Sequence, residues 1–144
     1  MAIKTVFITT TGAGSFTIPA DFISFVSVEA IGGGGAANYT YGAGAGGGAY
    51  AKSTSVTGLV AGGTAYYNVG TGGTGSSALS SGTDSWFNAA SNAAPTLTTQ
   101  GVLAKAGIGV SGNATGGAGG AAASCVGDVK FSGGTGGDNN GAFA

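Results

Sequence analysis

Glycine runs follow most of the strand-like segments of this sequence. The chain has 33 glycines among 144 residues, and they gather in patches. Ordering a glycine costs more backbone entropy than ordering any other residue, so a fold that orders this many must recover the loss through close backbone packing. The alternative is that the patches are floppy surface loops. The patches cover residues 32–35, 42–48, 70–75, 107–120 and 133–137.

Two of the patches, residues 116–121 and 133–138, repeat glycine in triplets. Polyproline II is a left-handed helix with three residues per turn and no internal hydrogen bonds. The chain has only two prolines and its triplets are brief, which excludes collagen. Glycine triplets without proline can pack side by side, because their N–H and C=O groups then bond between neighbouring helices. The triplets therefore indicate a layer of glycine-rich polyproline II segments, known as polyglycine II.

Alternating apolar and β-branched residues predict strands in the first half of the chain. Residues 3–10 form one predicted strand, followed by a turn at residues 12–14. Residues 22–31 have apolar side chains on both faces, which predicts a central strand covered on both sides. Residues 49–57 and 64–69 are predicted to pair as a hairpin.

Shorter strands are expected at residues 83–88, 96–103 and 128–131, and no capped amphipathic helix is visible. The predicted fold is all-β, a small β-sandwich or β-sheet layer with glycine-rich polyproline II segments and no significant helix. The length fits a single domain over residues 1–144. Residues 1–70 would be mainly strands with glycine runs, and residues 71–144 a mixture of short strands and glycine-rich segments.

The composition argues against several classes of function. Four basic and five acidic residues leave a net charge of −1, so binding of nucleic acid has almost no electrostatic support. No stretch reaches the roughly 18 apolar residues of a membrane span, so no membrane insertion is expected. Lys4 and a few apolar residues are too short for a signal peptide. The lone Cys125 excludes an intrachain disulfide and is expected to be a small buried side chain.

No catalytic or cofactor site emerges from the motifs. Without histidine there is no Ser-His-Asp or Cys-His arrangement, and we expect no enzyme, metal or cofactor. An Asp-Asn-Asn run at residues 138–140 lacks the full ligand set for calcium. The carboxylates are expected to serve turns and caps, with Asp84 fixing the backbone around Trp86 and Phe87. Three segments match the dinucleotide pattern G-x-G-x-x-G without a helix after them: 42/44/47, 70/72/75 and 107/109/112.

Aromatic residues offer the one functional lead. Asn38, Tyr39, Thr40 and Tyr41 stand between two glycine runs, as a loop with rigid amphipathic side chains suited to binding sugars or protein loops. The alternative is that these tyrosines cover the glycine layer. Elsewhere, Trp86 and Phe87 are expected in the core, and one of Tyr66 and Tyr67 is expected to be buried.

The order of these elements resembles one protein family. Residues 26–35 form a strand that ends in a glycine run, and residues 46–52 lead from glycines into an Ala-Tyr-Ala strand. Residues 67–73 end in Val-Gly-x-Gly-Gly, and residues 84–87 read Asp-Ser-Trp-Phe. This arrangement resembles the glycine-rich domain of bacteriophage tail-fibre and tail-tip adhesins. The resemblance implies polyglycine II helices stacked into a sandwich.

The resemblance also implies a function. The chain would be a non-enzymatic virion surface protein that displays loops for binding a host cell-surface component. It would act outside the cell and be released by lysis or a specialised route. The alternative is a structural role, as a capsid decoration or a self-assembling subunit of a surface fibre that contacts other virion proteins or further copies of itself. Ice binding would need a regular threonine spacing that the sequence lacks.

Overall fold

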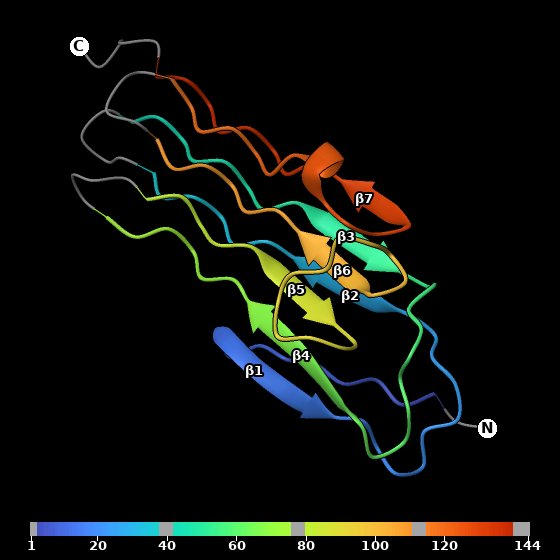
Figure 1. The fold of residues 1–144 in the computed structure, drawn as a ribbon. Helices are drawn as coiled ribbons and strands as arrows, with labels where there is room; N and C mark the ends of the chain where they lie inside the picture. The colour runs from blue at the N-terminus through green and yellow to red at the C-terminus, as the bar shows by residue number, and fades with distance from the viewer. Residues whose placement is uncertain (1–2, 38–41, 76–79, 111–114, 140–144) are drawn as a thin grey trace.

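The computed structural model describes residues 3–37, 42–75, 80–110 and 115–139. Two antiparallel sheets make up the strand region (Figure 1). Sheet A has the order β1-β4-β5-β6 and sheet B the order β2-β3-β7. The expected all-β class is confirmed, because the one helical element in the described residues is a short 3₁₀ turn, η1 (Ala122–Ser124). The strands are β1 (Gly12–Thr17), β2 (Val28–Ile31), β3 (Tyr50–Ser53), β4 (Thr64–Val69), β5 (Ser85–Asn88), β6 (Gly101–Ala104) and β7 (Val129–Phe131).

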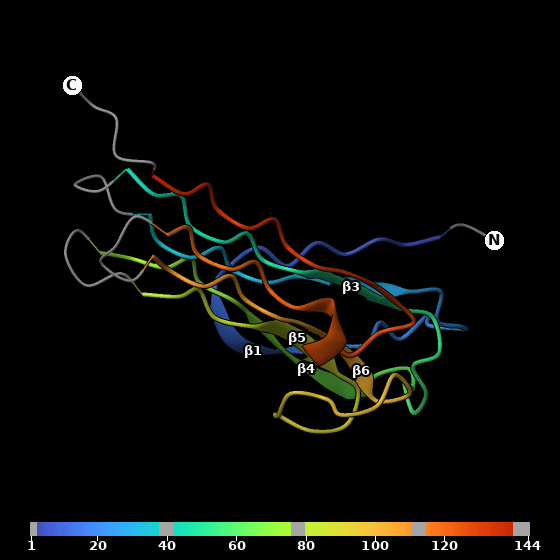
Figure 2. The same ribbon diagram turned by 90° about the horizontal axis from the view of Figure 1, so that it is seen from above.

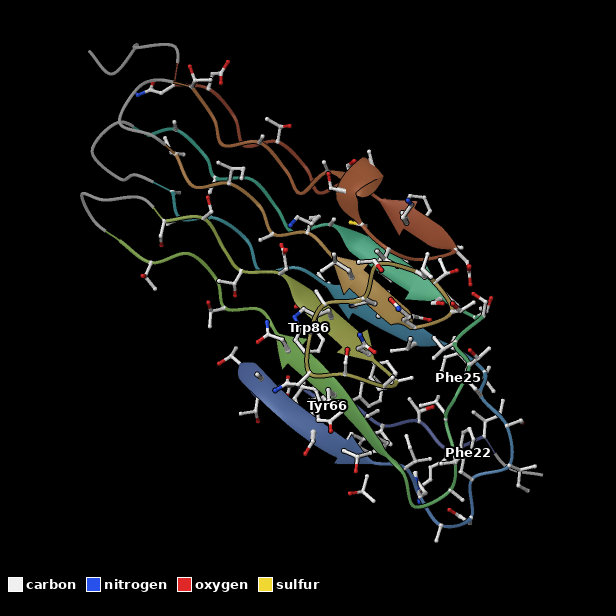
Figure 3. All side chains as sticks on the ribbon, viewed as in Figure 1. Phe22, Phe25, Tyr66 and Trp86 are labelled. Carbon is white, nitrogen blue, oxygen red and sulfur yellow. The ribbon has the colours of Figure 1, made fainter. Side chains whose placement is uncertain are left out.

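The two sheets pack face to face, with β6 over β2 and β3 (Figure 2). Small side chains fill the space between them, and Val102 is the largest fully buried one. Cys125 is buried in this cluster, as predicted. The larger aromatic residues gather around the strands and only partly enter the core (Figure 3). Half-burial is found for Trp86 and Phe87, which were expected in the core, and for both Tyr66 and Tyr67, of which one was expected to be buried.

The N-terminal strand prediction is wrong. Residues 3–9 belong to no strand, and the predicted turn at residues 12–14 is instead the start of β1. Gly14 lies opposite Tyr67 in the β1–β4 register. The Tyr67 ring lies across Gly14, so that an added Cβ would collide with it. Glycine in a strand lets an aromatic neighbour cover the backbone, and this is why a turn-like sequence pairs here.

Three further strand predictions need correction. Only the last four of residues 22–31 form a strand, and β2 is an edge of sheet B rather than a central strand. The predicted hairpin of residues 49–57 and 64–69 does not form, because β3 pairs with β2 and β7 while β4 pairs with β1 and β5. In the segment predicted at 96–103, β6 begins only at Gly101. The Gln100 side chain accepts the Thr96 N–H (2.9 Å) and closes a turn there.

Beyond the strands, the glycine runs continue as extended segments toward one end of the molecule (Figure 1). Their backbone hydrogen bonds join different segments and arrange them in two layers. Each segment of layer 2 bonds to two segments of layer 1 and so lies between them. Layer 1 contains, side by side, residues 70–75, 32–37, 42–49 and 132–138, and layer 2 contains residues 80–84, 105–110 and 115–121.

The bonds recur at intervals of three residues. The N–H groups of Gly44 and Gly47 donate to the carbonyls of Gly137 (2.9 Å) and Gly134 (2.8 Å). Among the described glycines, those in the body of these segments have negative φ. A period of three with bonds only between segments is the arrangement expected of polyglycine II. The same spacing recurs where Gly117 and Gly120 donate to Gly44 and Gly47, and where Gly133 and Gly136 donate to Gly120 and Gly117.

Close backbone approach explains why the inner positions are glycine. A Cβ at Gly46 would collide with the carbonyl of Ala118, and one at Gly119 with the carbonyl of Gly133. Most other glycines between the layers face a neighbouring carbonyl in the same way. The sequence left open whether the glycine patches form a packed layer or flexible surface loops. The described glycine segments form a packed layer.

Candidate functional site

Several segments of the double layer reach the same end of the molecule, far from the strands (Figure 1). There the Ala36 N–H donates to the Ser80 carbonyl (3.0 Å), and the Val110 N–H donates to the Ala36 carbonyl (3.0 Å). These bonds hold three separate parts of the chain together, close to where each leaves the layers. We call this region the layer end. Residues 38–41, 76–79, 111–114 and 140–144 adjoin these segments in the sequence.

Glycine and hydroxyl groups shape the layer end. Gly42 and Gly75 have φ values of 67° and 142°, which side-chain-bearing residues rarely adopt, so glycine is needed where the chain turns out of the layers. Between residues 70–75 and 80–84, the Thr74 N–H donates to Ser80 Oγ (2.7 Å), and that hydroxyl donates to the Thr74 carbonyl (2.7 Å). This reciprocal pair of hydrogen bonds fixes the spacing between residues 70–75 and residues 80–84 at the layer end.

Asp138 closes the other side of the layer end. Its carboxylate accepts the Gly116 N–H at 2.7 Å, one step beyond the bond from Gly136 to Gly117. The side chain therefore extends the ladder between two backbone segments. The described residues contain no group of three histidine, cysteine or acidic side chains placed to hold a metal ion.

The four residues predicted to bind a partner, Asn38, Tyr39, Thr40 and Tyr41, lie outside the described residues. Their described neighbours in the sequence, Ala37 and Gly42, are both exposed. The structure thus places the two residues that flank this segment, and binding by residues 38–41 stays a prediction.

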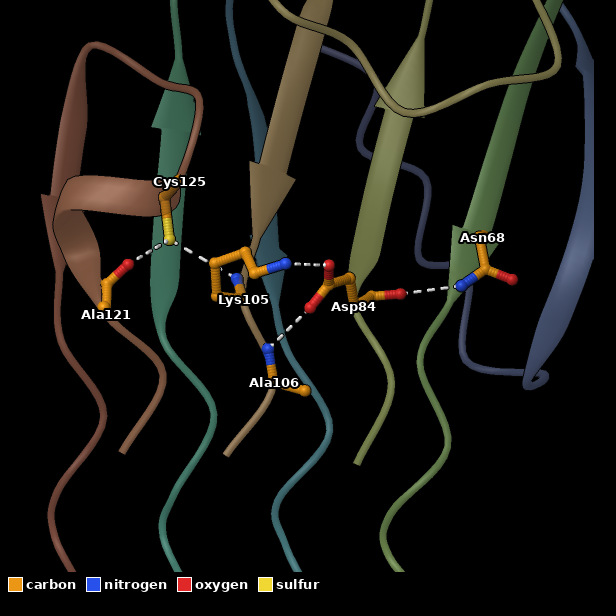
Figure 4. Close-up of polar contacts among 6 residues, drawn as sticks. All are labelled: Asn68, Asp84, Lys105, Ala106, Ala121 and Cys125. Atoms are coloured by element: carbon orange, nitrogen blue, oxygen red, sulfur yellow. Dashed lines mark hydrogen bonds and ion pairs between the residues drawn. The ribbon is translucent and has the colours of Figure 1, made fainter. Parts of the chain in front are cut away.

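A polar junction ties the double layer to the strands (Figure 4). The Asp84 carboxylate forms an ion pair with Lys105 Nζ and accepts the Ala106 N–H at 2.8 Å. The Asp84 carbonyl accepts a bond from Asn68 Nδ2 (2.7 Å), and the Cys125 thiol accepts the Lys105 N–H (3.3 Å). Asp84 was predicted to fix the backbone around Trp86 and Phe87, but its carboxylate instead reaches across to the segment that follows β6.

Asp128 holds sheet B together at its far end. Its carboxylate accepts the Thr54 N–H (2.6 Å) and the hydroxyls of Thr54 (3.0 Å) and Ser55 (3.1 Å). The Thr54 N–H bond, helped by these hydroxyls, lowers the pKa of Asp128. Sequence reasoning gave Asp128 a general turn role and missed this contact. The Ser-Thr-Ser run that begins at Ser53, the last residue of β3, is the signal that could have indicated it.

Of the dinucleotide-like segments, 42/44/47 uses its N–H groups within the layers, since Gly44 and Gly47 donate to other glycines. A phosphate would need free N–H groups at a helix N-terminus. None of the described parts of the chain contains a helix long and apolar enough to cross a membrane.

Comparison with known proteins gives one result. A family model described as a glycine-rich domain matches residues 9–144, nearly the whole chain. No curated protein matches the chain, and no solved structure matches it. The match includes the glycine segments, the strands and the layer end. The chain therefore belongs to the glycine-rich domain family.

Proposed function

We propose that this chain is a non-enzymatic virion surface protein, similar to the glycine-rich domains of phage tail-fibre and tail-tip adhesins. It binds a host cell-surface component through the segments that adjoin the layer end. The observation that carries the proposal is the meeting of several chain exits at one end of a backbone-bonded double layer. Such an arrangement fixes the residues that flank these segments on a hydrogen-bonded support, and binding segments are commonly carried by rigid scaffolds of this kind.

Within those segments, Asn38, Tyr39, Thr40 and Tyr41 are the proposed contact residues. Tyrosine offers a large contact area with few rotatable bonds, and the neighbouring amide and hydroxyl groups suit polar ligands such as envelope sugars. Labelled protein would be tested on a panel of intact bacterial strains and on their purified lipopolysaccharide. We expect a Tyr39→Ala/Tyr41→Ala variant to lose at least tenfold in affinity, about 1.4 kcal/mol.

The matched control carries Val60→Ala and Leu97→Ala, two side chains of the strand region that are 62% and 59% exposed. This variant should bind as the unchanged protein does. Equal binding by the tyrosine variant would contradict the assignment of residues 38–41. A protein that binds no strain but coats capsids in many copies would favour the alternative, a capsid decoration or a surface-fibre subunit.

A further inference from the structure

The outer face of sheet B carries an exposed apolar row. Ile31, Tyr50 and Phe131 stand side by side in the register of β2, β3 and β7. Ile31 is 68% and Phe131 is 61% exposed, and the rings of Tyr50 and Phe131 lie 6.0 Å apart. Phe7 is 85% exposed and lines a hollow that is also lined by Ile31 and Tyr50 of sheet B and by Tyr67 and Trp86 of sheet A. Rows of this kind on a protein surface mark contact sites.

The next row of the same face carries one charge of each sign. Glu29 and Lys52 are neighbours in the β2–β3 register and form an ion pair at 3.1 Å. Hydrogen bonds from Lys52 and then from Tyr50 lower the pKa of Glu29, so this carboxyl is charged at neutral pH. The charges of Glu29 and Lys52 cancel, so this row adds no net charge to the face. The face presents one acidic and one basic side chain next to each other.

Beyond the strands, the face continues mainly as glycine, with the exposed Ala37 next to the layer end. Residues three positions away from Ile31, Tyr50 and Phe131 lie on the same side of a polyglycine II segment, because its period is three. Room for a side chain differs among the glycines on this side: a Cβ at Gly134 or Gly137 would meet nothing within 4 Å, whereas one at Gly44 would lie 3.0 Å from the Gly137 nitrogen. We call the apolar row, the charged row and these glycines the outer face. Its glycines are Gly34, Gly44, Gly47, Gly72, Gly134 and Gly137.

The opposite surface shows that outward positions of such segments need not be glycine. In layer 2, Ile108, Thr115 and Ala118 are exposed and carry side chains. Nothing within the chain thus requires glycine at Gly134 or Gly137, where φ is also negative. Bare glycine is required where a second backbone approaches closely, as it does between layers 1 and 2.

We propose that the outer face binds the outer face of a second copy of this chain, related by a two-fold axis that runs parallel to the strands between β2 and β3. This axis places Glu29 opposite the partner's Lys52 and Ile31 opposite the partner's Tyr50. In layer 1, whose order is 70–75, 32–37, 42–49 and 132–138, each glycine segment then meets a glycine segment. At these positions the face is complementary to itself, which is what a two-fold dimer requires.

This dimer is a property beyond the proposed host binding and does not depend on it. Because the axis runs along the strands, both layer ends would point in the same direction. Two weak binding sites held this way would act on a cell surface with a high effective concentration.

Sedimentation velocity over a range of protein concentrations tests the dimer. We expect the unchanged chain to sediment as a dimer and the Ile31→Asp/Phe131→Asp variant as a monomer with the same circular dichroism spectrum. The control is Leu97→Asp, since residues 89–100 lie on the other side of the molecule from β3 (Figure 2). A monomeric wild type, or a dimer that survives the double substitution, would overturn the proposal.

Charge reversal tests the arrangement of the two copies. Glu29→Lys places two lysines opposite each other, and we expect at least a tenfold weaker association. Adding Lys52→Glu restores opposite charges across the interface and should restore association to within about threefold of wild type, a difference of about 0.7 kcal/mol. If the single and double variants associate equally well, the face-to-face pairing is wrong.

Discussion

The strand region and the glycine double layer are built from the same chain by opposite means. Between the sheets, side chains such as Val102 are buried, and the backbones stay apart by the width of those side chains. In the layers the buried side chains are few, such as Ala36, Ala43 and Val110, and at most of the glycines a carbonyl of a neighbouring segment lies against the Cα position. One region is held by apolar burial and the other by backbone hydrogen bonds.

The difference predicts how each region responds to change. A side-chain core tolerates substitutions that conserve volume, because rotamers adjust. The double layer has nothing that can adjust, since both contacting groups are backbone. Its positions should therefore divide sharply into those where a methyl group is forbidden and those where it is harmless.

The largest effect is expected from Gly46→Ala. The new methyl would collide with the Ala118 carbonyl, which cannot move without breaking its bond from Ile108. We expect a loss of about 3 kcal/mol or more in the free energy of unfolding, measured by chemical denaturation. A loss below about 1 kcal/mol would contradict the close contact between Gly46 and the Ala118 carbonyl.

An intermediate effect is expected at the junction of the two regions. Asp84→Ala removes the acceptor of the Ala106 N–H and the partner of Lys105. The expected cost is about 1–3 kcal/mol, with faster hydrogen exchange at the Ala106 amide. Asp21→Ala is the control, because Asp21 is an exposed carboxylate before β2. Equal stability of the two variants would remove the junction role.

The smallest effect, with the opposite sign, is expected from Gly134→Ala. A methyl group here meets nothing within 4 Å, and φ is negative. Replacing glycine at such a position restricts the unfolded chain and stabilises the fold by about 0.4–1 kcal/mol. The measurement belongs in the Ile31→Asp/Phe131→Asp background, where the proposed dimer cannot contribute. A destabilised variant would show that Gly134 faces hidden contacts within the chain.

Parts of the fold could be predicted from the sequence. The triplets predicted polyglycine II because their period of three is a local property of the chain. The alternation at residues 64–69 predicted β4 with the correct bounds. Strand pairing was not predictable, because alternation indicates a half-buried strand and carries no information about its neighbour. Residues 3–10 alternate as well as β4 does, yet no strand forms in residues 3–9.

The candidate site was less accessible from the sequence. The aromatic character of Tyr39 and Tyr41 indicated a binding segment, but the gathering of the chain exits depends on bonds between segments far apart in the sequence. The Ser-Thr-Ser run at residues 53–55 indicates that a carboxylate could bind there, but its partner Asp128 and the outer face both depend on the pairing of β3 with β7. The sequence also does not distinguish an enclosed glycine such as Gly46 from an open one such as Gly134, because the difference lies in which backbone segment approaches each of them.

The bonds from Gly44 and Gly47 to Gly137 and Gly134 have a consequence for synthesis of the protein. A ribosome completes residues 42–49 long before it reaches residues 132–138, so layer 1 lacks its edge segment until those last residues have been made. Sheet A has all of its strands by Ala104, but sheet B also waits, because its strand β7 immediately precedes that segment. Contacts of such high sequence separation form slowly. A nascent chain that stops before residue 132 would leave the N–H groups of Gly44 and Gly47 without their carbonyl acceptors along that edge.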